Sequence, residues 1–316
     1  MRKFTPYLKD MFQQQRLTPL SQLGLLIGLC GFGIIVSAII TGILGRLLLN
    51  LPVEQLSEAL TKPENISFSR LLQVITTFLV MGLPALILAG MSSSNPTRQL
   101  GLRTPANLLQ AILVIFMVAA GFLVSGSLIE ITELIPIPAT AANYFRQLED
   151  QYNKAVMSIG AMNSFADYLF SLFILAIVPA IFEELLFRGC LQRILITITK
   201  NAALGIIIAS VVFSAIHISY YGFLPRLFLG VMLGYIFYLS KNIWLSIWAH
   251  FLNNAYTLTV MYSMSRQGKV SVEAAEDSFP WYYFFLGALL IVLLLLSFKK
   301  SSDVLLARRG YEPENN

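Results

Sequence analysis

Two adjacent glutamates and an arginine, in FEELLFRG at residues 182–189, stand inside an otherwise apolar stretch. The run LFSLFILAIVPAI precedes them, and CLQRILITITK continues the helix-compatible apolar spacing to about Thr199. Ionisable residues are costly inside a membrane segment, so Glu183 and Glu184 predict a functional site in the middle of a helix. A carboxylate beside an imidazole can hold a water molecule and deprotonate it.

The only two histidines of the chain are spaced so that they can meet this acidic pair. Glu183 lies 17 residues before Lys200, and His217 lies 17 residues after it. Two antiparallel helices folded at Lys200 would bring both side chains to the same depth, about 25 Å from the turn. In WAHFLNNAY, His250 and Asn254 are at i and i+4, hence on one helical face. A carboxylate, two imidazoles and a carboxamide are therefore expected to converge within the membrane.

Such a group can hydrolyse a peptide bond inside or beside the membrane, because an imidazole and a carboxamide can donate hydrogen bonds to a developing oxyanion. Other protease chemistries fit the sequence poorly. It has no H-E-x-x-H for zinc, no aspartate at membrane depth for an aspartyl dyad, and no G-x-S-x-G nucleophile turn.

Each of these residues also has a purely structural interpretation. Arg188 is i+4 from Glu184, which favours an ion pair within the helix. Taken alone, His217 is typical of a satisfied core histidine, and Asn254 of an interhelical hydrogen bond. Cys190 is expected to be a packed, inert thiol. The joint spacing favours the functional interpretation.

Composition requires that these residues be positioned by membrane helices. Of 316 residues, 56% are hydrophobic and only 12% are charged, whereas soluble chains average about 25% charged. We predict an all-α, polytopic integral membrane protein with about eight transmembrane helices around an intramembrane catalytic cavity. The expected spans are 23–49, 72–91, 107–129, 168–198, 202–218, 224–240, 243–262 and 280–298.

Charge placement predicts the orientation of the chain. With alternating crossings, most basic residues fall on the side of both termini and most acidic residues fall in the other loops, so both termini are predicted to be cytoplasmic in a multi-pass protein of the cell membrane. The net charge of +5 then reflects orientation and contact with membrane lipids, and no clustered basic patch favours nucleic acid. The longest loop, about 130–167, can hold a short helix at the outer surface.

Three regions are expected along the chain. Residues 1–166 supply N-terminal scaffold helices, 167–262 form the catalytic helical core, and 263–316 hold the last membrane helix and a cytoplasmic tail.

Three short motifs together resemble a known family. EELLFR at 183–188 matches E-E-x-x-x-R, FSAIH at 213–217 matches F-x-x-x-H, and HFLNN at 250–254 matches H-x-x-x-N. These are the motifs, in the same order, of the CPBP (Abi) family, which includes type II CAAX prenyl proteases and bacteriocin-processing and bacteriocin-immunity proteins. The resemblance covers roughly residues 165–260.

The resemblance implies an intramembrane endopeptidase that acts on a membrane-associated protein or peptide, including lipidated, CAAX-like ones. By motif position, Glu183 and His217 would activate the water, and His250 and Asn254 would stabilise the oxyanion. Glu184 and Arg188 would support the site.

The sequence leaves open whether the site needs a metal, and it leaves two other functions possible. Family members are described both as metalloproteases and as metal-independent glutamate proteases. If zinc is present, Glu183, His217 and His250 would be its three ligands; we favour the metal-free form because no ligand triad stands out. A non-catalytic peptide-binding or bacteriocin-immunity protein is the second function, and a proton-coupled transporter is the third.

Overall fold

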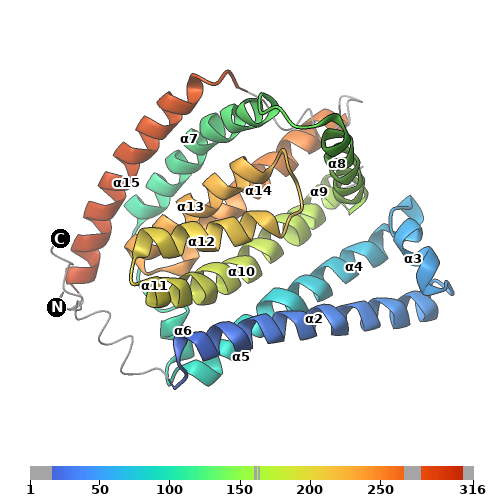
Figure 1. The fold of residues 1–316 in the computed structure, drawn as a ribbon, viewed down its shortest axis with the longest axis horizontal. Coiled ribbons are helices and arrows are strands. Elements are labelled where there is room, and N and C mark those ends of the chain that lie inside the picture. Colours follow the sequence, from blue (N-terminus) through green and yellow to red (C-terminus); the bar gives the residue numbers. More distant parts are fainter. Residues whose placement is uncertain (1–15, 160–161, 163, 267–278, 309–316) are drawn as a thin grey trace.

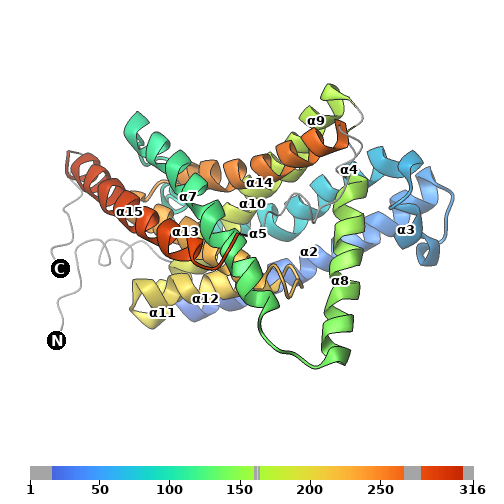
Figure 2. The same ribbon diagram turned by 90° about the horizontal axis from the view of Figure 1, so that it is seen from above.

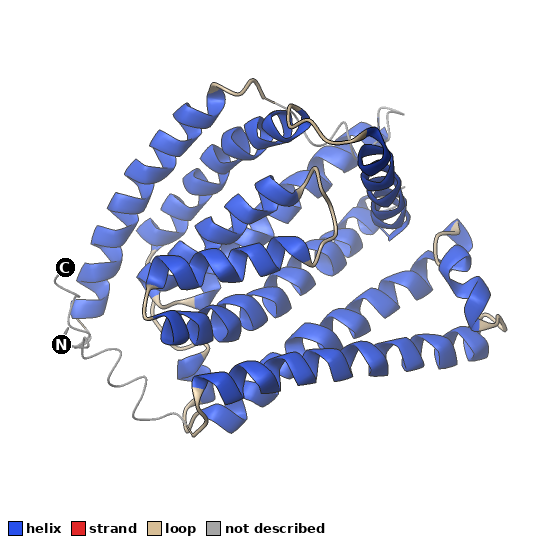
Figure 3. Ribbon diagram, in the orientation of Figure 1, coloured by secondary structure: helices blue, strands red, loops and turns tan. Residues whose placement is uncertain are grey.

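The computed structural model describes residues 16–159, 162, 164–266 and 279–308, and within them the chain forms helices and no strand (Figures 1 and 3). The α-helices are α2 Pro19–Leu48, α3 Val53–Ala59, α4 Ile66–Thr77, α5 Leu83–Ser92, α6 Pro96–Gln99, α7 Leu108–Glu133, α8 Ala139–Ile159, α9 Phe165–Ser171, α10 Val178–Glu184, α11 Arg193–Thr199, α12 Ala202–Ala215, α13 Phe223–Ser240, α14 Ile243–Arg266 and α15 Tyr283–Ala307. Three π-helical segments, η2 Phe78–Gly82, η3 Leu172–Ile177 and η4 Leu185–Gln192, join α4 to α5, α9 to α10 and α10 to α11.

The predicted all-α, multi-pass membrane fold is confirmed. Every predicted span forms helix, and six are long and apolar enough to cross a membrane: Pro19–Leu48, Ile66–Ser92, Leu108–Glu133, Phe165–Thr199, Phe223–Ser240 and Tyr283–Ala307. The other two predicted spans, now α12 and α14, are not among these six, for separate reasons. Helix α12 has 14 residues, about 21 Å of helix against a hydrocarbon core of about 30 Å. Helix α14 has 24 residues but carries histidine and asparagine on its middle turns.

Two tight turns bring the motif-bearing helices together. Lys200 ends α11 and Lys241 ends α13, both in the left-handed conformation (φ 54° and 56°). After the first turn, the side chain of Asn201 accepts a hydrogen bond from the N–H of Leu204 and caps α12. The predicted hairpin at Lys200 is therefore confirmed.

The register of this hairpin also agrees with the sequence spacing. Phe187 and Phe213 each lie 13 residues from Lys200, and their rings meet edge to face with centroids 5.2 Å apart. Helix α12 nevertheless ends at Ala215, so His217 lies just beyond the helix, in the loop before α13.

Two glycines let α13 approach its neighbours closely. A Cβ at Gly230 would lie 2.9 Å from Ser210, and one at Gly234 would lie 2.7 Å from Ile206, both on α12. A small residue at every fourth position is a common membrane packing device because it allows backbones to come together. The carbonyl oxygens of both glycines lie beside η4, the segment of the motif helix that follows Glu184.

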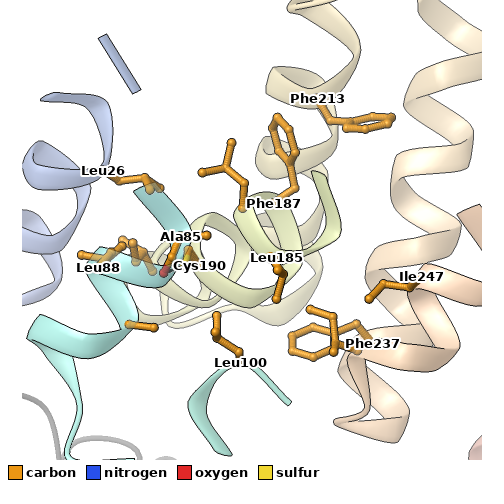
Figure 4. Packing of buried hydrophobic residues seen from close by; sticks show 14 of the residues in the cluster. Leu26, Ala85, Leu88, Leu100, Leu185, Phe187, Cys190, Phe213, Phe237 and Ile247 are labelled. Atoms are coloured by element: carbon orange, nitrogen blue, oxygen red, sulfur yellow. Dashed lines mark hydrogen bonds between the residues drawn. The ribbon is translucent and has the colours of Figure 1, made fainter. Parts of the chain in front are cut away.

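The helix that carries the acidic pair runs through the centre of a packed core (Figure 4). Leu185 and Phe187 of η4 lie between α2 and α5 on one side and α12 to α14 on the other. Cys190 is buried in this cluster, and its thiol donates to the carbonyl of Ala85 at 3.7 Å. It is a packed thiol, as the structural interpretation predicted.

Helix α8 lies across one end of the bundle, the end opposite the Lys200 turn (Figures 1 and 2). It occupies the region where a short surface helix was expected. At the same end, Arg70 of α4 joins the N-terminal helices to α9, with 3.7 Å to a carboxylate oxygen of Asp167 and 3.2 Å to the hydroxyl of Ser171. Helix α2 begins and helix α15 ends on the other side of the bundle, at the left of Figure 1.

Candidate active site

The acidic pair sits where the helix changes its winding. Glu183 and Glu184 are the last residues of α10, and the wider π-helical segment η4 begins at Leu185. Single π-helical turns inside α-helices occur frequently at functional sites. Both glutamates are buried, with 9% of Glu183 and 0% of Glu184 exposed.

Glu184 accepts hydrogen bonds from three side chains. The guanidinium Nη1 of Arg188 lies 2.8 Å from its Oε1, and Nδ1 of His250 lies 2.9 Å from the same oxygen. The hydroxyl of Ser246 donates to Oε2. A charge at zero exposure requires such partners, because an unpaired buried carboxylate costs several kcal/mol or more. The ion pair predicted between Glu184 and Arg188 is present.

Arg188 is itself held on several sides. Its Nη2 donates to the carbonyl of Gly230 at 3.1 Å, and its guanidinium carbon lies 4.7 Å from the ring centroid of Phe213. One turn later, Gln192 donates to the carbonyl of Gly234 at 3.0 Å. The closely packed glycines of α13 thus provide backbone acceptors for two side chains of the motif helix.

His250 joins the two glutamates. A carboxylate only accepts hydrogen bonds, so Nδ1 of His250 carries the proton that it shares with Glu184. The other ring nitrogen, Nε2, lies 3.8 Å from Oε2 of Glu183. This separation is too long for a direct hydrogen bond.

His217 is anchored differently. Its Nδ1 lies 2.8 Å from the carbonyl oxygen of Phe213, so Nδ1 donates and Nε2 keeps its lone pair. The ring of Phe213 contacts both histidines edge to face, with its centroid 5.1 Å from that of His217 and 5.9 Å from that of His250. Among the described residues, no hydrogen bond or ion pair joins His217 directly to Glu183.

Asn254 lies one turn beyond His250 on α14, half-buried. The side-chain nitrogen of Asn253 donates to Oδ1 of Asn254 at 3.3 Å. The structure therefore brings Glu183, Glu184, Arg188 and His250 into one contact group, with His217 joined to it through an aromatic ring and Asn254 one helical turn away.

Three polar residues of this region were missed from the sequence. Ser246 lies four residues before His250, and Gln192 lies four residues after Arg188, so the i, i+4 rule could have indicated both. Arg226, near the start of α13, interacts electrostatically with Glu183 and with His217. A lone arginine in an apolar stretch is the sequence signal that could have indicated it.

The residues named for zinc do not form a ligand cluster. Among the residues that the structure describes, no three histidine, cysteine, aspartate or glutamate side chains gather closely enough to hold a metal ion. Glu183, His217 and His250 therefore do not fit a three-ligand site in this arrangement.

The site thus contains a buried glutamate that faces an imidazole across 3.8 Å, a pairing that can support hydrolysis. Residues 165–256 match the family model described as type II CAAX prenyl endopeptidase, Rce1-like. The matched segment contains all six predicted site residues, and it confirms the resemblance found in the three motifs. The match supports a CAAX-type intramembrane protease in general. No curated protein and no solved structure matches the chain.

Proposed function

We propose that this protein is an intramembrane endopeptidase that hydrolyses a peptide bond of a membrane-associated protein or peptide, including lipidated, CAAX-like substrates. The observation that carries the proposal is the pair formed by Glu183 and His250. A carboxylate oxygen and an imidazole nitrogen face each other at 3.8 Å, next to a second glutamate whose hydrogen bonds are satisfied.

In this proposal Glu183 is the general base. A water molecule held between Glu183 and Nε2 of His217 gives a proton to Glu183 as its oxygen attacks the carbonyl carbon of the scissile bond. The lone pair on Nε2 of His217 suits the accepting role, because Nδ1 is already committed to the carbonyl of Phe213. Glu183 then passes the proton to the leaving amine as the C–N bond breaks.

His250 and Asn254 stabilise the oxyanion. Glu184 accepts from Nδ1 of His250 and so holds the imidazole ring in place; a proton on Nε2 is then donated in a hydrogen bond to the developing negative charge. Asn254, on the next turn of the same face, supplies a carboxamide donor. One such donor is often worth about 3 kcal/mol in the transition state. Arg188 and Ser246 keep Glu184 ionised and fixed in position.

The metal-free mechanism is part of the proposal. Chelation by EDTA or 1,10-phenanthroline during purification and assay is expected to leave turnover unchanged. Turnover that is lost on chelation and restored by added zinc would replace this mechanism with the metalloprotease alternative.

The test is cleavage of a membrane-tethered or lipidated peptide by the purified protein. Glu183→Ala and His217→Ala are expected to abolish turnover, whereas Glu58→Gln, at an exposed surface ion pair with Lys62, is the matched control and keeps it. Undiminished turnover in both site variants would remove the proposed base. Binding of the peptide by wild type without any cleavage would favour the peptide-binding alternative.

A further inference from the structure

The loop that carries His217 has a strained backbone. Residues 216–222 connect α12 to α13, and Ile218, directly after the histidine, has φ 50°. The left-handed region is unfavourable for a β-branched residue, and such conformations persist only where the surroundings fix them. The side chain of Ile218 is 71% exposed, so its own packing does not hold the loop.

Helix α8 supplies the contacts that hold this loop. The hydroxyl of Ser219 lies 2.9 and 2.8 Å from the two carboxylate oxygens of Glu149, and it accepts from the N–H of Gly222 at 3.0 Å. One turn before Glu149, the ring of Phe145 stacks on Tyr220, with centroids 4.7 Å apart and planes 9° apart. Ser219 is only 6% exposed, so its end of the hydrogen bond with the Glu149 carboxylate is buried.

We propose that α8 positions His217 through two contacts, which we call the α8 clamp. Phe145 stacks on Tyr220, and Glu149 accepts a hydrogen bond from Ser219. Glu149 is a positioning residue: it touches no reacting atom but fixes the backbone two residues from the histidine. The proposal rests on the proposed function, in which His217 holds the water. Glu149 and Phe145 lie outside the matched segment 165–256, on the long connection between α7 and α9.

The clamp matters because it fixes the direction in which Nε2 of His217 points. Nδ1 of His217 is tied to the last turn of α12 through Phe213, so the direction of Nε2 depends on where the backbone leaves that helix. Without Glu149 the loop can relax from the strained conformation, and a displacement of about 1 Å at a catalytic group can cost about 100-fold in rate.

The experiment compares Glu149→Ala with Asp150→Asn, a matched change at the exposed neighbouring acid. Glu149→Ala is expected to lower kcat about 10- to 100-fold with KM within about twofold of wild type, and to speed amide hydrogen exchange at Gly222. Asp150→Asn is expected to change neither. Glu149→Gln keeps one acceptor oxygen for Ser219 and should fall between the two.

A double variant separates the clamp from a general loss of stability. Ser219→Ala removes the same bond, so Glu149→Ala with Ser219→Ala should be no slower than the slower single variant. Additive losses, or wild-type kcat and exchange in Glu149→Ala, would overturn the clamp. Full activity of His217→Ala would instead refute the role of His217 in the proposed function, so the two failures are distinguishable.

Discussion

Removing Arg188 tests whether the buried charge network is organised as described. In Arg188→Leu, Glu184 keeps the bonds from His250 and Ser246 but loses its ion-pair partner at zero exposure. Breaking a buried pair from one side costs about 3–5 kcal/mol, and the carbonyl of Gly230 loses its donor at an added cost of about 1 kcal/mol. We expect the free energy of unfolding to fall by about 4–6 kcal/mol.

A paired substitution shows whether that cost comes from the unpaired charge. In Glu184→Gln with Arg188→Met no charge is left unpaired, and the amide oxygen still accepts from His250, so most of the lost stability should return. Activity should not return, because the negative charge beside His250 is gone. The assay is denaturant unfolding in detergent micelles, followed by peptide cleavage with the same samples. A single variant as stable as wild type, or a double variant as unstable as the single one, would refute this reasoning.

Two further predictions concern packing and orientation. Gly234→Val should destabilise the fold by about 1–3 kcal/mol through overpacking against α12, whereas Gly24→Val, with nothing within 4 Å of its added Cβ, should not; equal effects on unfolding in micelles would contradict the close packing. Single cysteines introduced at Asn201 and Asp150 should react with a membrane-impermeant thiol reagent from opposite sides of a vesicle, with Asn201 on the cytoplasmic side; labelling from the same side would contradict the predicted topology.

Much of the arrangement could be predicted from spacing because helices and tight turns are local structures. Equal distances of Glu183 and His217 from Lys200 predicted a hairpin at this residue, and the i, i+4 spacing predicted the ion pair of Glu184 with Arg188. Both follow from helical geometry alone. The family resemblance came from the same residues and is confirmed by the match to residues 165–256.

Other features depend on contacts between distant segments, which one sequence does not reveal. The π-helical winding after Glu184 has no composition signal here. The end of α12 before His217 was hidden because the apolar run continues past it. Apart from its spacing from His250, nothing in the sequence distinguishes Ser246 from other serines, and its hydrogen bond to Glu184 is visible only in the structure. The contact of Glu149 with Ser219 joins residues 70 positions apart.

The central claim is that Glu183 activates water to cut a membrane-associated peptide bond. The most direct measurement compares the peptide termini in membranes of cells that contain either the wild-type protein or Glu183→Ala at equal abundance. New termini that arise within or beside membrane segments should be present with the wild type and absent with the variant. The same set of termini in both samples would contradict the account.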